Sequence, residues 1–264
     1  MSVATTESDS EPTLDLTPAM GQRSGFGNLL RKELGQWWGT RQWWIQLLAW
    51  VVILNGVAAL IMIDPESTAN EAVQTFLLMG AFVIGVGVVL TVQGAVVGER
   101  ESGTAAWIMS KPVSPSAFIL AKLVAHSLGF LVTAVLVPTL VFAAEAAVLL
   151  SVPLSYGSLA LGVVVVALAV VFYVALTLAL GTLSRGRGPV AGIGVGMLLM
   201  GQFFAGMLPL ALVIVTPWLL GDVATSVALG TELEFNGAIP VIATAVTTSA
   251  LVLAALWRFA REEF

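Results

Sequence analysis

Residues 98–122 read GERESGTAAWIMSKPVSPSAFILAK, and they form the longest polar interruption between two strongly apolar stretches of the chain. The segment starts with the charged run Glu99–Glu101 and ends with two prolines, Pro112 and Pro115, before the chain becomes apolar again. Between them lies a short apolar run, 107–109. If the flanking stretches cross a membrane, this segment is the largest folded element between two spans on that side of the membrane.

The composition predicts a membrane protein that spans the bilayer several times. Hydrophobic residues make up 58% of the 264 positions, charged residues only 10%, and the mean hydropathy is +0.97. A soluble domain of this size needs a more strongly charged surface. The absence of cysteine excludes disulfides, thiolate metal sites and cysteine nucleophiles.

The net charge of −5, with few lysines, indicates a solvated acidic surface of the kind found in high-salt organisms. No basic patch stands out, so we expect no nucleic-acid partner.

Six apolar stretches predict an all-α fold of six transmembrane helices. Each is long enough to cross a hydrocarbon core of about 30 Å at about 1.5 Å per helical residue. Their approximate bounds are 43–63, 72–97, 118–150, 158–183, 189–215 and 239–257. With both termini in the cytoplasm, every Lys and Arg falls in or beside a cytoplasmic segment, as the positive-inside rule requires.

Two segments precede the first span. Residues 1–24 are acidic and rich in Ser, Thr and Pro, which predicts a disordered cytoplasmic tail ahead of a membrane domain at 25–264. Residues 26–42 place leucines and tryptophans at helical spacing among basic residues. This pattern predicts an amphipathic helix in the membrane interface, and the alternative is a simple polar lead-in to the first span.

Two features inside the spans are candidate functional residues. Gly188, Gly192 and Gly196 recur every four residues, which favours close helix packing within the bundle or across a dimer. Glu145 is the one acid predicted within a span, so it is a candidate for the substrate path. It lies near the outer end of that span, where it could instead reach water or pair locally.

The chain offers little for catalysis. Its single histidine, His126, lies just inside the third predicted span and reads best as a packed helix residue. One histidine and no cysteine cannot build a conventional metal cluster, and no P-loop motif occurs. We therefore expect no catalytic residue, no metal and no nucleotide site of its own.

The segment 98–110 is the best candidate for a protein contact, because it offers an apolar surface rimmed by charge. An ordinary interfacial loop is the alternative. The candidate contact residues are Glu99, Arg100, Glu101, Gly103, Thr104, Trp107, Ile108 and Met109.

Several short motifs together resemble the ABC-2 type permeases, the membrane subunits of ATP-binding-cassette transporters. They are Glu-Arg-Glu-x-Gly-Thr at 99–104, Lys-Pro-Val-Ser at 111–114, Ile-Leu-Ala-Lys-Leu at 119–123, and Arg-Lys-Glu-Leu at 31–34. Pro115 and Ala121 depart from the usual Arg and Gly. The resemblance covers residues 26–264. Within the family, the chain is similar to the group that resembles the nitrous-oxide-reductase maturation permease.

The resemblance implies an exporter in a prokaryotic cell membrane, built from two permease chains, identical or paralogous, and two separate ATPase subunits. Residues 98–110 would be the cytoplasmic coupling helix between spans two and three. ATP and magnesium would be bound by the ATPase and not by this chain. The alternatives from other classes are a membrane-embedded enzyme and a non-catalytic membrane scaffold or assembly factor.

Overall fold

The computed structural model describes residues 25–150 and 154–262, and these residues form helices and connecting turns without a strand. The predicted tail at 1–24 lies outside the described residues. Six helices are long and apolar enough to cross a membrane, which confirms the predicted number of spans. They run Gln42–Ile63, Ala69–Glu101, Pro115–Leu149, Tyr156–Leu183, Arg187–Met207 and Ala238–Ala260.

Most spans are built from more than one helical segment. Spans one to three comprise α2 (Gln42–Trp50), η1 (Val51–Asn55) and α3 (Gly56–Ile63), then α4 (Ala69–Val92) and α5 (Gly94–Glu101), then α7 (Pro115–Phe130), η2 (Leu131–Leu136) and α8 (Val137–Leu149). Spans four to six are α9 (Tyr156–Leu183), α10 (Arg187–Phe204) with η3 (Ala205–Met207), and α13 (Ala238–Ala260). Helix α1 (Phe26–Trp38) precedes span one. The helices between spans are α6 (Thr104–Met109), α11 (Leu210–Val213), η4 (Pro217–Leu219) and α12 (Leu220–Leu229).

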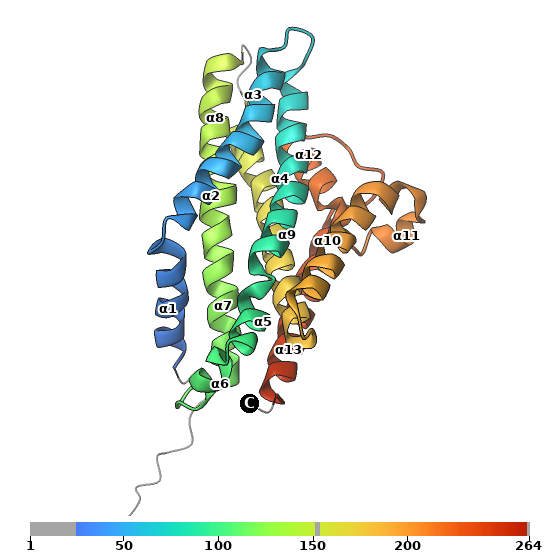
Figure 1. The fold of residues 1–264 in the computed structure, drawn as a ribbon. Helices are drawn as coiled ribbons and strands as arrows, with labels where there is room; N and C mark the ends of the chain where they lie inside the picture. Colours follow the sequence, from blue (N-terminus) through green and yellow to red (C-terminus); the bar gives the residue numbers. More distant parts are fainter. Residues whose placement is uncertain (1–24, 151–153, 263–264) are drawn as a thin grey trace, which may run out of the picture.

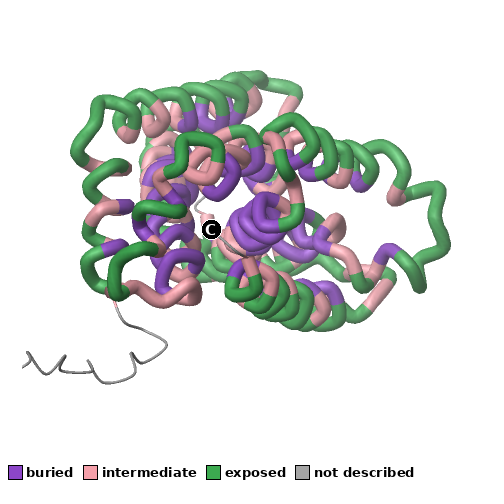
Figure 2. The backbone as a smooth tube through the Cα atoms, turned by 60° about the horizontal axis from the view of Figure 1, so that its bottom comes forward, coloured by how far each residue is buried: buried purple, intermediate pink, exposed green. Residues whose placement is uncertain are grey.

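Helix α9 is the centre of the bundle. Helices α4, α12 and α13 pack directly on it, and it has the largest buried share of the six spans. The buried residues gather toward the inside of the bundle, whereas the outward faces of the helices are exposed (Figure 2). Exposed leucines, valines and isoleucines on the outward faces suit contact with lipid rather than water.

All described lysines and arginines lie at or near one end of the bundle, which we call the basic end. Both ends of the described chain and α6 lie at this end, drawn at the bottom of Figure 1. Helix α1 runs upright beside α7 and packs on it (Figure 1). The sequence predicts α1 in the membrane interface, and its depth relative to the lipid stays a prediction.

Two prolines explain where helices depart from the predicted spans. The fifth apolar stretch extends to residue 215 in sequence, but the helix stops at Met207, because Pro209 cannot donate a backbone hydrogen bond. In the third span, the wider π-helical turn η2 ends at Leu136, two residues before Pro138. Proline has no backbone N–H, so the carbonyl four residues before it lacks its usual partner.

Candidate functional site

The candidate site is the corner where span two ends and α6 begins. Helix α5 carries the span to Glu101, and Gly103 then turns the chain with φ +72°, a left-handed conformation that favours glycine. The Ser102 and Thr104 hydroxyls lie 2.8 Å apart across this turn, and the Ser102 hydroxyl donates to the Glu99 carbonyl oxygen at 3.3 Å. These contacts fix the start of α6 against the end of α5.

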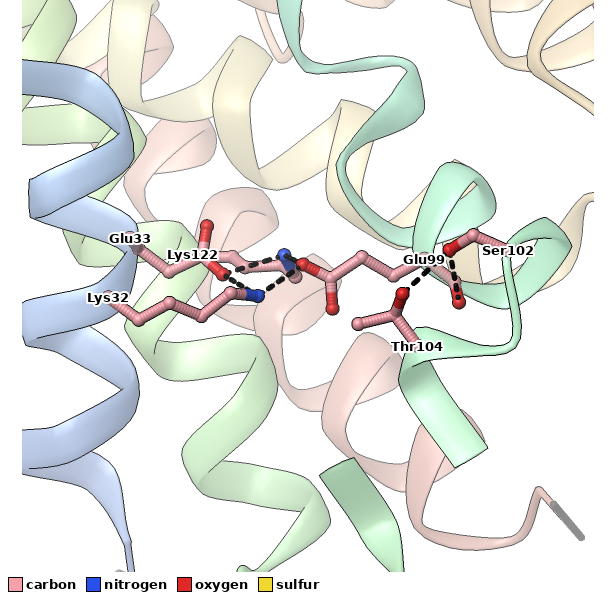
Figure 3. A network of polar contacts seen from close by, with 6 residues as sticks. All are labelled: Lys32, Glu33, Glu99, Ser102, Thr104 and Lys122. Carbon is pink, nitrogen blue, oxygen red and sulfur yellow. Dashed lines mark hydrogen bonds and ion pairs between the residues drawn. The ribbon is translucent and has the colours of Figure 1, made fainter. Parts of the chain in front are cut away.

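Behind the corner, four charged side chains form a closed cluster (Figure 3). Lys122 Nζ donates to Glu99 Oε1 at 2.7 Å and to Glu33 Oε1 at 2.9 Å. Lys32 Nζ donates to the same two oxygens, at 2.7 Å and 3.3 Å respectively. The two ammonium groups and two carboxylates therefore alternate, and we call this group the ion cluster.

The ion cluster is largely removed from solvent. The exposed fraction of the side chain is 2% for Lys122, 6% for Glu33, 15% for Glu99 and 32% for Lys32. Buried charges are costly unless they are paired, and here two positive groups balance two negative ones. Because its members come from α1, α5 and α7, the ion cluster ties the helix before span one to spans two and three at the basic end.

The electrostatics of the ion cluster favour the charged forms of Glu33 and Lys32. Burial by itself would raise the pKa of Glu33, but the charge and hydrogen bond of Lys122 together with the charge of Lys32 hold that pKa below its ordinary value. Burial would likewise lower the pKa of Lys32, and its hydrogen bond to Glu99 with the nearby carboxylate charges raises it instead.

The next two charged residues, Arg100 and Glu101, contact α9, α10 and the end of α13. Arg100 Nη2 donates to Glu262 Oε2 at 2.9 Å, just beyond the end of α13, and Nη1 donates to the Ser184 carbonyl at 2.9 Å. That carbonyl follows the last turn of α9, where the helix dipole favours a cation. Glu101 Oε2 lies 3.4 Å from Arg187 Nε at the start of α10, in a pair about half exposed.

The three consecutive charges Glu99–Glu101 therefore connect the corner with α1, α7, α9, α10 and the end of α13. The sequence predicts all three as contact residues for a partner. The structure places Glu99 and Arg100 mainly in contacts within the chain, whereas Glu101 stays half exposed.

The apolar residues of α6 are not equally exposed. Trp107 is 61% exposed, Ile108 is buried in the core, and Met109 packs partly against that core. The Lys111 ammonium lies 3.5 Å from the centroid of the Trp107 ring, a cation–π contact on the outside of α6. Of the three residues 107–109 that the sequence predicts as an apolar contact surface, Trp107 is the one that is mainly exposed.

The remaining predicted residues lie apart from this corner. Gly188, Gly192 and Gly196 lie on an exposed face of α10, and a Cβ added at any of them would meet no atom within 4 Å. They therefore make no packing contact within the described chain, and their dimer contact stays a prediction. Glu145 lies toward the far end of α8, and its Oε2 has no hydrogen-bond partner among the described residues. His126 lies edge-on to the Trp37 ring at 5.6 Å between centroids.

Sequence reasoning missed the partners of the charged run, namely Glu33, Lys32, Lys122, Arg187 and Glu262. One signal was present, because Glu33 lies on the same helical stripe as Leu29 and Trp37, at four-residue spacing. This stripe is the face that packs on the rest of the bundle. The described residues bring together no group of three His, Asp or Glu side chains that could hold a metal.

Comparison with known families gives one match. The family described as "ABC-2 family transporter protein" matches residues 44–255, about four-fifths of the chain. The match includes spans two to five completely, most of spans one and six, and the whole α5–α6 corner. No curated protein matched the chain.

Proposed function

This chain belongs to the ABC-2 family of transporter proteins, and we propose that it is the permease subunit of an ATP-binding-cassette exporter. It is a multi-pass membrane protein whose six spans suit the role. In this proposal a separate ATPase binds ATP and magnesium, and two permease chains form the translocation unit. The basic end faces the cytoplasm, in keeping with the positive-inside rule.

The observation that carries the proposal is the position of Trp107. It is the exposed apolar residue of a short helix at the basic end, and the charged residues behind it are tied to the bundle by ion pairs. Tryptophan is among the residues most enriched in the energetic centres of protein interfaces. In our proposal Trp107 is the contact with the ATPase.

The contacts behind Trp107 suggest how motion passes from the ATPase to the spans. A displacement of α6 moves span two directly, because only the short turn at Gly103 separates α6 from α5. The ion cluster couples the same displacement to α7 and α1, and Arg100 couples it to α9 and the end of α13. Glu99 and Arg100 are thus positioning residues in this account.

Co-purification with the ATPase tests the docking role. We expect Trp107→Ala to reduce the recovered complex strongly while the unfolding temperature of the chain stays unchanged, because this side chain is mostly exposed. The matched control is Trp44→Ala, another exposed tryptophan, which lies in span one. Equal recovery of the ATPase with Trp107→Ala and the wild type, together with unchanged ATP-linked transport, would contradict the docking role of Trp107.

A further inference from the structure

A second feature of the molecule lies away from α6, beside the segment between spans five and six. A cavity of about 560 Å³ opens among α4, α9, α10, α11 and α12. Its wall includes apolar and aromatic side chains together with a few polar groups, as in typical binding sites for organic molecules. The residues used below are Phe82, Tyr173, Leu198, Trp218, Asp222 and Glu234.

The cavity reaches deep into the bundle. Tyr173 lies about 25 Å along α9 from the first residue of that helix, at about 1.5 Å per residue, and so near the middle of the spans. Asp222 and Glu234, in contrast, belong to the segment between spans five and six, and both are exposed. The cavity therefore leads from the exposed segment between spans five and six into the interior of the helical bundle.

A polar group on the cavity wall has no partner among the described residues. Tyr173 is only 3% exposed, and its hydroxyl makes no hydrogen bond among the described residues. The indole ring of Trp218 packs against Gly201 of α10, which buries its Nε1 and leaves the ring as an apolar part of the wall. Polar groups in apolar surroundings are normally hydrogen-bonded, so the Tyr173 hydroxyl is available to water or to a polar group of a molecule in the cavity.

The charges at the cavity favour a positive ligand. Its ionisable wall residues besides Tyr173 are two acids, Asp222 and Glu234. All described lysines and arginines lie at or near the basic end, so no ammonium or guanidinium group neutralises these acids. A cavity lined by one sign of charge and set in apolar walls concentrates ligands of the opposite sign.

We propose that this cavity binds an organic cation with an apolar body. The positive group lies between Asp222 and Glu234, and the apolar body packs against Phe82, Leu198 and Trp218. Aromatic rings and carboxylates together are suited to such cations. Binding itself requires no ATPase, but the identification of this ligand class as the cargo rests on the proposed transport function.

Fluorescence anisotropy with purified chain in nanodiscs, without any ATPase, tests the site. The probe is rhodamine 6G, a cationic aromatic dye, with fluorescein as an anionic dye of similar shape and empty nanodiscs to measure partition into lipid. We expect saturable binding of rhodamine 6G to the chain, and at least tenfold weaker binding of fluorescein. Equal binding of both dyes, or no binding beyond that of empty nanodiscs, would overturn the proposal.

Variants locate the site. Asp222→Asn combined with Glu234→Gln should weaken rhodamine 6G binding about tenfold or more, with an unchanged unfolding temperature. The matched control is Glu66→Gln, which removes an exposed acid between spans one and two that does not line the cavity. Wild-type affinity in the double variant would exclude this cavity as the site.

The two proposals fail independently. Dye binding by a chain that recruits no ATPase would contradict the transporter proposal and leave the cation site intact. Recruitment of the ATPase by a chain that binds no cation would contradict the cation site and leave the transporter proposal intact.

Discussion

At the scale of single residues, the ion cluster is the feature with the largest energetic consequences. Lys122 is almost fully buried and is the hydrogen-bond donor to both Glu33 and Glu99. A buried pair adds little to stability compared with well-packed apolar residues, but removing one partner leaves an uncompensated charge. The ion cluster is therefore more important for fixing the geometry of three helices than for net stability.

Replacing the central lysine tests this view. We expect Lys122→Met to cost about 3–5 kcal/mol in the free energy of unfolding, because both carboxylates lose their buried partner. Thermal unfolding of the purified protein in detergent measures the loss. Arg31→Met, which removes an exposed charge of α1 that pairs with no acid among the described residues, is the control and should have little effect. Equal unfolding temperatures for the two variants would contradict the proposed role of Lys122.

The pH dependence of stability should report on Glu33. Its folded pKa lies below the ordinary value of 4.5, so its contribution is present above about pH 4.5 and is lost as pH falls through the folded value. We expect the unfolding temperature to drop in this acidic range, and to drop less steeply in Glu33→Gln. Indistinguishable acid profiles for the wild type and the variant would show that Glu33 is not the group responsible.

The residue scale is also where sequence was least informative. Glu33, Glu99 and Lys122 were each visible in separate motifs, but no sequence rule says that they meet. Their contact depends on the packing of α1 against α7, which brings Glu33 and Lys122 together (Figure 3). The role of Glu99 as a positioning group follows from this contact and not from its motif.

At the scale of elements, the six spans were predictable, because a long run of apolar residues has few other stable states in a protein. The residues at which the spans end were less predictable. The fifth span stops before Pro209, and α6 is a separate short helix because the chain turns at Gly103. Hydropathy reports the apolar length, whereas the ends depend on backbone hydrogen bonds and single residues.

The turn at Gly103 gives a prediction at this scale. A side chain at φ +72° strains the backbone, so Gly103→Ala should cost about 1–2 kcal/mol even though its Cβ would meet no atom. We expect lower stability in thermal unfolding and weaker ATPase recovery, because α6 shifts. Gly27→Ala in α1 is the control, since its site is also open but helical, and it should be neutral or stabilising. Equal effects of the two changes would contradict a role for the turn.

At the scale of the whole molecule, the glycines of α10 divide into two sets. A Cβ at Gly194 would collide with Val89 of α4, so this glycine is needed inside the chain. Gly192 faces outward and meets nothing. Sequence spacing alone did not separate an internal packing face from an external one, because both recur on the same helix.

This difference predicts separate effects on folding and on assembly. Gly194→Leu should lower the unfolding temperature, because the bundle must open around Val89. Gly192→Leu should leave the unfolding of the chain unchanged and weaken the predicted dimer, measured by light scattering of the purified protein. An unaltered dimer in Gly192→Leu would remove the argument for a glycine contact between two permease chains.

The central claim is that α6 is the surface on which a soluble ATPase docks. Photo-crosslinking tests it most directly, with a benzophenone amino acid placed at Trp107 and, as a control, at Tyr156, which is exposed at the opposite end of the bundle. We predict a crosslink from position 107 to an ATP-binding-cassette ATPase and none from position 156. A crosslink to that ATPase from 156, or none from 107 in cells where transport is active, would contradict the account.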